Sequence, residues 1–522
     1  MSKRKHAIEA HFQSGVRLHG AGRLQEAEQV YRQVIAANPG HADSFHMLGV
    51  IASQCGQPEG AVACIDRAIA LQPSAAIYHV NRANALLVLG RLDAARDGCR
   101  TALRLKRNCA EAYQVLGHVL SDLGQAEEAV AAYHDALRYN PRLPDLHNGL
   151  GLALREANQL EAAVGMLRIA VDREPKSVDL RCNFAGVLKD LGQIDAAEAV
   201  YRQILAEHPD NAVAHNNLGI LLLLAGRFAE GWDNWEWRFR AERLPTRPLT
   251  KPLWQGENLA GRSILIQAEQ GIGDMIQFCR YVPLVAAADG RVVLEVHRPL
   301  VRLMASLAGV AQVVAIGEAA PPFDLQCPMM SLPSAFHHRG EAQIPSEAQI
   351  PSTVPYLRAD PALVEHWRRR TENLPGLKVG LVWAGNPERI RMDNRRSLRP
   401  DRIARLAEVP GVQLISLQKG GPDGGWRPAH DWTEELSDFA DTAALVEMLD
   451  LVIGVDTAVV HLAGALGKPV WLLNRYDTCW RWQLGRDDSP WYPTLRQFRQ
   501  KTPGDWDDVI ATVARQLAEL AA

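Results

Sequence analysis

Several patterns that identify common protein classes are absent from this 522-residue chain. Its eight cysteines include no C-x-x-C pair, which argues against a zinc site and against a disulfide framework. Neither sign of charge dominates, because 57 basic residues stand against 60 acidic ones, so bulk electrostatics suggest no nucleic-acid partner. We therefore expect a protein of a reducing, cytoplasmic compartment.

Long hydrophobic runs are also missing. One of the longest, Leu218 to Ala225, is too short to cross a bilayer. The start, Met1 to Phe12, is basic but has no apolar core of the kind a signal peptide needs. The sequence predicts no transmembrane segment and leaves peripheral association, for example at the inner membrane, as the open alternative.

Tryptophan is absent before Trp232, although the chain holds 13. In that stretch two series of small residues recur every 34 residues, which is typical of stacked helical hairpins. The series are Gly15, Gly49, Ala83, Gly117, Gly151, Ala185 and Gly219, and then Ala27, Ala61, Ala95, Ala129, Ala163, Ala197 and Gly231. Proline ends five of the first six units, and Arg107 takes its place in the third. By spacing and residue type, residues 8–241 resemble the tetratricopeptide repeat.

The change in composition predicts the domain boundaries. We expect an α-solenoid over residues 1–241, a proline-rich linker over 242–260, and two Rossmann-like halves over 261–360 and 361–522. Three tryptophans, Trp232, Trp235 and Trp237, are expected to cap the solenoid and fix it to the next domain; a ligand platform is the alternative.

Short apolar runs alternate with helical stretches after Gly261, which favours two parallel sheets covered on both faces. The expected strands are Ser263–Ala268, Val292–Val296, Gln312–Ile316, Phe323–Gln326, Lys378–Trp383, Val412–Gln418, Leu451–Val455 and Val470–Asn474. Ligands of such folds bind beyond the carboxyl ends of the strands, so the loops that follow these strands are where we expect function.

The first such loop contains Gly271, Gly273 and Asp274. Glycines allow a tight turn, and Asp274 stands where the next helix should begin. We interpret Asp274 as a general base that faces the cleft between the halves; an N-cap without a catalytic role is the alternative.

The second such loop and the segment after the next strand hold cations. One begins at Ala384 and holds Arg389, Arg391, Arg395 and Arg396, which could bind phosphate through paired hydrogen bonds unless they form only a solvated surface run. Lys419 follows the next strand and adds a cation beside glycines at the same sheet edge.

The loop after Leu451–Val455 gives the sharpest signal. Asp456 or Thr457 should cap a short helix that ends at Gly467, with its free N–H groups and positive dipole end toward the cleft, where a pyrophosphate would fit. His461 lies about one turn into that helix, and a buried structural histidine is the alternative interpretation.

Asp-Thr-x-x-x-His before a small-residue helix and Lys-Pro, with an upstream Gly-x-Gly-Asp loop, resembles the heptosyltransferase-related glycosyltransferases of family 9. The resemblance spans residues 261–515 and implies a GT-B fold. It also implies that Asp274 is the base and that Lys419 and Arg396 hold the donor phosphates. Asp456, Thr457, Ala458 and His461 would then line the nucleotide-sugar pocket, with neither metal nor cofactor required.

The resulting hypothesis is an inverting transferase that moves a sugar from a nucleotide donor to a hydroxyl acceptor. The solenoid would recruit a protein or glycan acceptor, a layout shared with the O-linked N-acetylglucosamine transferases. Assembly into a homo-oligomer is a further possibility that the sequence does not decide. Two alternatives remain: a peptide-binding scaffold with a degenerate GT-B module, and an isomerase or phosphorylase on the same fold.

Overall fold

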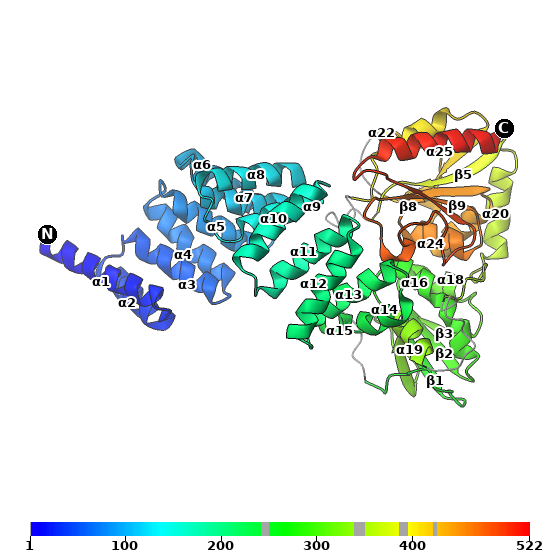
Figure 1. Cartoon of the computed structure of the whole chain (residues 1–522), viewed down its shortest axis with the longest axis horizontal. Coiled ribbons are helices and arrows are strands. Elements are labelled where there is room, and N and C mark those ends of the chain that lie inside the picture. The colour runs from blue at the N-terminus through cyan, green and yellow to red at the C-terminus, as the bar shows by residue number, and fades with distance from the viewer. Residues whose placement is uncertain (1, 242–249, 339–349, 386–394, 421–424) are drawn as a thin grey trace. The chain divides into compact units, whose positions relative to one another are not determined.

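The computed structural model describes residues 2–241, 250–338, 350–385, 395–420 and 425–522. Its contacts divide the chain into two compact units, Met1–Lys176 and Ser177–Ala522 (Figure 1). No helix within the described ranges combines the length and the hydropathy that crossing a membrane requires.

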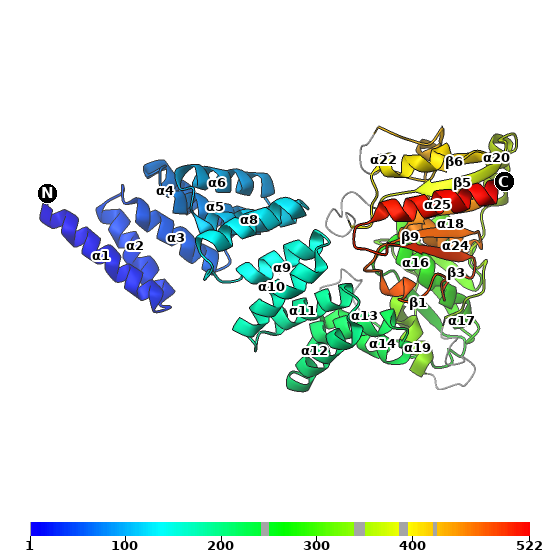
Figure 2. The same cartoon turned by 45° about the horizontal axis from the view of Figure 1, so that its top comes forward.

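The first unit is a series of antiparallel helical hairpins. Each odd-numbered helix packs on the even-numbered helix that follows it (Figures 1 and 2). The helices are α1 (Ser2–Gly20), α2 (Leu24–Ala37), α3 (Ala42–Gln54), α4 (Pro58–Leu71), α5 (Ala76–Val88), α6 (Leu92–Leu105), α7 (Ala110–Asp122), α8 (Ala126–Tyr139), α9 (Leu146–Glu156) and α10 (Leu160–Arg173).

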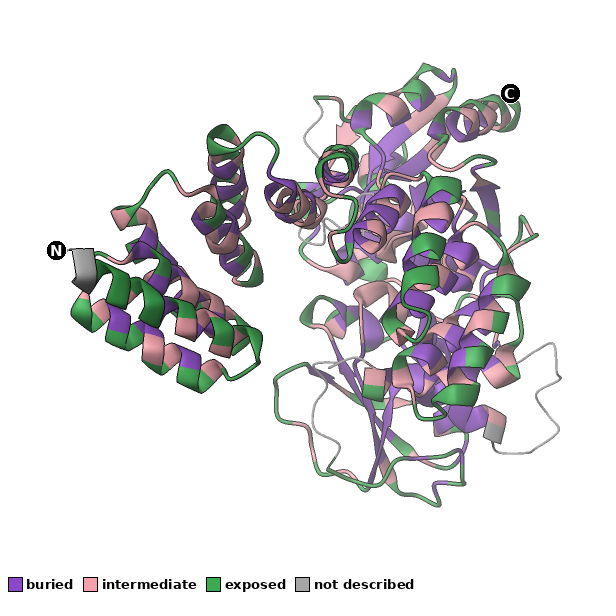
Figure 3. Cartoon of the chain, turned by 60° about the vertical axis from the view of Figure 1, so that its left-hand side comes forward, coloured by how far each residue is buried: buried purple, intermediate pink, exposed green. Residues whose placement is uncertain are grey.

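The recurring small residues lie where paired helices cross. A Cβ atom at Gly49 would come within 2.4 Å of the Ile65 side chain, and one at Gly151 within 2.6 Å of Leu167. Ala61 is fully buried on the partner helix. The buried residues therefore face one another between the helices (Figure 3), and close packing sets the 34-residue period that predicted the solenoid.

The second unit begins with the last helices of the repeat series. They are α11 (Val178–Asp190), α12 (Ile194–Glu207), α13 (Ala212–Leu224), α14 (Phe228–Trp235) and α15 (Arg238–Ala241). These helices thus share a compact unit with the α/β part of the chain, and part of the expected linker, residues 242–249, lies outside the described residues.

Two tryptophans join these helices to the α/β part. The ring of Trp232 lies edge-on to that of Trp480 at 5.5 Å, and Trp235 lies 5.8 Å from the same ring. Both are buried in the core, which confirms the packing interpretation for these two residues. Trp237 instead stacks on His215 at 4.0 Å.

The first sheet is parallel and has the strand order β3-β2-β1-β4. Its strands are β1 (Ser263–Gln267), β2 (Arg291–Val296), β3 (Val310–Ala315) and β4 (Leu325–Pro328). The associated helices are α16 (Ile272–Phe278), α17 (Val282–Ala286), α18 (Val301–Met304) and α19 (Leu332–His338). Both central strands are almost wholly buried, as expected for a sheet covered by helices.

The second sheet is also parallel, in the order β10-β9-β8-β5-β6-β7. Its strands are β5 (Leu377–Val382), β6 (Val412–Ser416), β7 (His430–Asp431), β8 (Leu451–Val455), β9 (Val470–Asn474) and β10 (Leu495–Arg499). Helices α20 (Pro361–Thr371), α22 (Pro400–Ile403), α23 (Phe439–Glu447), α24 (Ala458–Ala465) and α25 (Trp506–Ala521) accompany it. The expected fold class, a helical solenoid followed by two parallel α/β halves, is confirmed.

Candidate active site

The candidate site lies where the first turns of α16 and α24 meet. These helices follow β1 and β8, which are inner strands of the two sheets, and pack against each other. At the contact, a Cβ atom on Gly273 would lie 3.1 Å from Cδ2 of His461 and 3.5 Å from Cα of Ala458. A glycine therefore permits this close approach without displacing the His461 side chain. The predicted glycine loop and the predicted donor helix are in direct contact.

Asp274 occupies the third position of α16, and Gly271 is its N-cap. The N-cap interpretation of Asp274 was wrong, although its carboxylate does stabilise the helix start, because Oδ2 accepts a hydrogen bond from the Gly271 N–H at 3.0 Å. Oδ1 forms an ion pair with the guanidinium of Arg481, in the loop after β9. Both carboxylate oxygens thus have partners.

Arg481 connects the two halves. Its Nε donates to Oε1 of Gln277, on α16, at 2.9 Å, and its guanidinium lies 4.3 Å from the Trp480 ring centroid. Burial acts to lower the pKa of Arg481, but Asp274, Cys479 and Asp456 outweigh it and raise the pKa above its ordinary value. Arg481 is therefore a fixed positive charge between two carboxylates.

Asp456 and His461 form the opposite side of the site. Oδ1 of Asp456 lies 3.7 Å from Nε2 of His461, and Nδ1 of His461 lies 2.9 Å from the Tyr492 hydroxyl. The imidazole also stacks on Trp482, with centroids 5.1 Å apart. His461 is thus both a packed histidine and a neighbour of Asp456, a predicted donor-binding residue.

The electrostatics of this pair are set by burial and by two guanidiniums. Burial acts to raise the pKa of Asp456, but His461, Arg396 and Arg481 hold that pKa below its usual range. Burial lowers the pKa of His461, and the opposing effects of Asp456 and Asp274 do not restore it. A neutral imidazole beside an ionised Asp456 follows at neutral pH.

Thr457 is the N-cap of α24, and Ala458 is its first residue. The Thr457 backbone is extended, with φ −140° and ψ 167°, and its buried Oγ1 has no hydrogen-bond partner among the described residues. Gly467 follows the helix with a φ of +75°, as the expected end of this helix requires. The first turn of α24 therefore combines backbone N–H groups with an unsatisfied hydroxyl.

The other predicted cations that the structure describes, Arg396, Arg395 and Lys419, have different surroundings. Arg396 lies close enough to Asp456 to lower its pKa. Arg395 instead pairs with Asp477, at 2.6 Å, and with Asp190 of α11 at 3.5 Å. Exposed Lys419 donates from Nζ to the carbonyl of Leu436. Neither of the last two contacts brings its cation to Asp456.

Two expected arginines, Arg389 and Arg391, lie outside the described residues. Sequence reasoning did not predict the ion pair of Arg481 with Asp274. The available signal was its position between Trp480 and Trp482, just beyond the carboxyl end of β9. Among the described residues, no group of three or more His, Cys, Asp or Glu side chains is arranged to hold a metal ion.

The fold and this site define a repeat protein joined to a two-sheet α/β region with an interhelical polar centre. Residues 46–108, 115–178 and 183–231 match the family model of the tetratricopeptide repeat. Residues 437–502 match that of glycosyltransferase family 9 (heptosyltransferase). The chain thus carries tetratricopeptide repeats in its amino-terminal part and a heptosyltransferase-family match in its carboxyl-terminal part. The latter match includes Asp456, His461 and Arg481 but not Asp274.

Protein FlbA of Caulobacter vibrioides is 30% identical to the chain over 336 residues, which are 58% of this chain and 54% of FlbA. The chain thus spans about half the length of this curated relative. Among solved structures, Pseudomonas aeruginosa pilF is 18% identical, covering 41% of this chain and 97% of its own, with a TM-score of 0.37. PilW, described as a type IV pilus biogenesis factor, is also 18% identical, covering 41% and 98%, with a TM-score of 0.39. At these scores the structures carry no argument about function.

Proposed function

We propose that the chain is a glycosyltransferase of GT-B fold that moves a sugar from a nucleotide-sugar to a hydroxyl acceptor. The observation that carries the proposal is the direct contact of α16, which bears Asp274, with the first turn of α24, which bears Asp456 and His461. A general base and an anion-binding helix start must be neighbours if an acceptor hydroxyl is to attack a sugar held by its diphosphate.

Charge balance gives each residue a role. Asp274 takes the proton of the acceptor hydroxyl while the acceptor oxygen attacks the anomeric carbon from the face opposite the leaving group, which inverts that centre. The bond from that carbon to the diphosphate breaks, and the negative charge stays on the leaving nucleoside diphosphate. Arg396 and the N–H groups at the start of α24 stabilise that charge.

We expect two arrangements of this site, one with the ion pair of Arg481 and Asp274 formed and one with it released. In the structure it occupies one oxygen of Asp274, so Asp274 can accept a proton there only after the ion pair has been released. A donor diphosphate offers Arg481 a stronger partner, because a guanidinium binds phosphate through two parallel hydrogen bonds. Donor binding would thereby free the base. Lys419 would join the donor by a similar exchange, away from the Leu436 carbonyl.

The repeats supply the acceptor side of the proposal. Tetratricopeptide repeats indicate protein partners, and we propose that they present a protein or glycan acceptor to the α/β part. The reaction as written needs no metal or cofactor. All eight cysteines are unpaired, which supports a cytoplasmic location, peripheral to the inner membrane if the acceptor lies there.

The test is incorporation of label from a panel of nucleotide-sugars, together with thermal-shift titration by the corresponding nucleotides. We expect at least one nucleoside diphosphate to stabilise the full chain and the matching sugar to be transferred. Stabilisation without transfer would remove the enzymatic assignment. If no nucleotide stabilises the chain, the scaffold alternative replaces it.

A further inference from the structure

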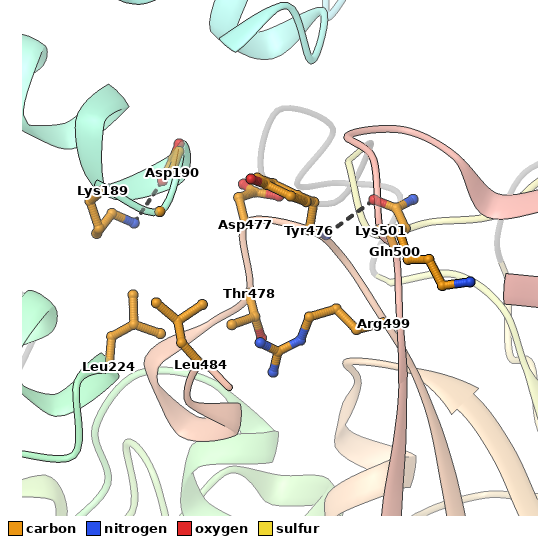
Figure 4. Close-up of a pocket in the computed structure, with 11 residues that line it drawn as sticks. Lys189, Asp190, Leu224, Tyr476, Asp477, Thr478, Leu484, Arg499, Gln500 and Lys501 are labelled. Carbon is orange, nitrogen blue, oxygen red and sulfur yellow. Dashed lines mark hydrogen bonds and ion pairs between the residues drawn. The ribbon is translucent and has the colours of Figure 1, made fainter. Parts of the chain in front are cut away.

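A cavity lies apart from the contact of α16 with α24. It has a volume of about 370 Å³ and lies between the carboxyl end of α11 and the loops that follow β9 and β10 (Figure 4). Leu224 and Leu484 form an apolar wall, and the remaining lining is mostly polar or charged. Its volume is near the lower end of the roughly 300–1,000 Å³ of small-ligand sites.

Arg499 gives this cavity an uncompensated positive charge. Its Nη2 donates to the carbonyl of Gln483 at 2.5 Å and to Oε1 of Gln497 at 2.8 Å, and both acceptors are neutral. No carboxylate pairs with Arg499 in the part of the chain that the structure describes. Burial lowers its pKa, as expected for a guanidinium without a counter-ion. An anion in the cavity would offset that cost.

The carboxylates in the cavity wall do not supply this anion. Asp190 pairs with Lys189 at 2.8 Å and with Arg395 at 3.5 Å. Asp477 pairs with the same Arg395 at 2.6 Å and with Arg475 at 3.7 Å. Two carboxylates are thus shared among three cations, and Arg499 adds a fourth.

Gln500 lines the same cavity with an amide of fixed orientation. Its Oε1 accepts from the N–H groups of Tyr476, at 3.1 Å, and Gly504, at 3.2 Å, which fixes the orientation of the amide. Its Nε2 is buried and has no partner among the described residues, and the whole side chain is only 5% exposed. Figure 4 shows Tyr476 and Gln500 together on one wall and the guanidinium of Arg499 reaching toward Thr478.

We propose that this cavity binds the phosphate or carboxylate group of a small ligand, with Arg499 as its counter-ion. Lys189 adds charge from the solenoid side, so the ligand would contact both a repeat and the second sheet. The proposal does not rest on sugar transfer, since none of its residues belongs to the contact of α16 with α24.

The test uses the full chain, with inorganic phosphate and acetate as separate probes and glucose as the neutral control, in calorimetric titration at matched ionic strength. We expect one of the two anions to bind and glucose not to bind. Arg499→Gln should weaken anion binding at least about tenfold, the loss of one charge-assisted hydrogen bond. Arg496→Gln, on the exposed side of the same strand, should leave it unchanged. Equal binding by wild type and Arg499→Gln, or binding of neither anion, would overturn the proposal.

A second variant keeps the proposal testable if Arg499→Gln does not fold. Lys189→Gln changes a helix-end side chain that is 19% exposed, and it should weaken anion binding by about threefold, because Lys189 shares its charge with Asp190. Nucleoside diphosphate affinity serves as the independent readout and should not change in either variant. Loss of nucleotide and anion binding together would make the cavity part of the donor site and overturn a separate ligand site, whereas nucleotide binding without anion binding would leave the transferase proposal standing.

Discussion

Asp274 and Arg481 are 207 residues apart in the sequence and form an ion pair that joins the two α/β halves. The pair places a carboxylate of α16 and a guanidinium of the loop after β9 beside Asp456 and His461. It therefore links the residue proposed as base to the residues proposed to hold the donor.

Replacing Asp274 with asparagine should abolish most transfer while retaining donor binding. The amide keeps the shape of the carboxylate and cannot take a proton, so we expect turnover to fall about 10²–10⁴-fold. Nucleotide affinity should be retained or rise, since Arg396 and α24 remain in place and Arg481 no longer has to leave the Asp274 carboxylate. Initial rates and calorimetric titration measure the two quantities.

The matched control for this change is Asp289→Asn. Asp289 is exposed and has a φ of +62°, a conformation that asparagine also tolerates. Wild-type rates are expected in the control. Wild-type rates in Asp274→Asn as well would remove the catalytic role of Asp274.

Gly273→Ala should disturb the contact of α16 with α24. The new Cβ atom would lie 3.1 Å from Cδ2 of His461, so the buried imidazole must move by a few tenths of an ångström, and we expect a loss of about 1–3 kcal/mol in the free energy of unfolding. Gly165→Ala is the control, because no atom lies within 4 Å of its Cβ position and the helix interior favours alanine. Urea unfolding compares the two, and an unchanged midpoint in Gly273→Ala would contradict the close approach.

The buried pair of Arg238 and Glu269 should dominate the junction of the last repeat with the first sheet. Nε of Arg238 lies 2.5 Å from Oε1 of Glu269, and the two side chains are 1% and 0% exposed. Glu269→Leu leaves Arg238 short of a partner and should cost about 3–5 kcal/mol, whereas adding Arg238→Met should recover part of the loss. Glu365→Gln, in an exposed pair with Arg369, should cost less than about 1 kcal/mol. Simple additivity of the two buried changes would contradict the coupling.

The free energy of unfolding of the second unit should decrease as pH is lowered, partly because of His461. Its pKa is lower when folded than when unfolded, so its contribution is complete above the unfolded pKa of about 6.5 and decreases as pH falls below that value. Asp456, whose folded pKa is also lowered, adds a further loss below about pH 4. His461→Gln should flatten the slope of the unfolding free energy between about pH 6.5 and 5. An identical slope in the variant would show that His461 does not titrate as inferred.

The repeat period and the apolar strands could be predicted from sequence because close packing restricts residue type at each position. β8 and β9 have the expected bounds, because each is a run of apolar residues in which only Asn474, at the end of β9, is polar. Strand β10 was missed because arginines and a glutamine interrupt its apolar pattern, and β7 is only a dipeptide. Buried elements with regular apolar patterns are therefore predictable, whereas a short strand and a strand with polar residues are not.

The candidate site was predictable only as separate loops. Gly273, Asp274, Asp456 and His461 were identified from their places after strands, and the structure brings them together. The partner of Asp274 was not predictable, since nothing near Asp274 in sequence indicates Arg481. Lys419 is the opposite case. Its place at a sheet edge was predicted, but the hydrogen bond of its side chain to the Leu436 carbonyl was not.

The central claim is that this chain transfers a sugar with Asp274 as the base. The most direct measurement is mass-spectrometric detection of labelled product after the wild type and Asp274→Asn are each incubated with an extract of the source cells and a panel of labelled nucleotide-sugars. The account predicts one labelled product with the wild type and none above background with Asp274→Asn, although the variant still binds the nucleotide. No labelled product with the wild type, or the same amount with both proteins, would contradict it.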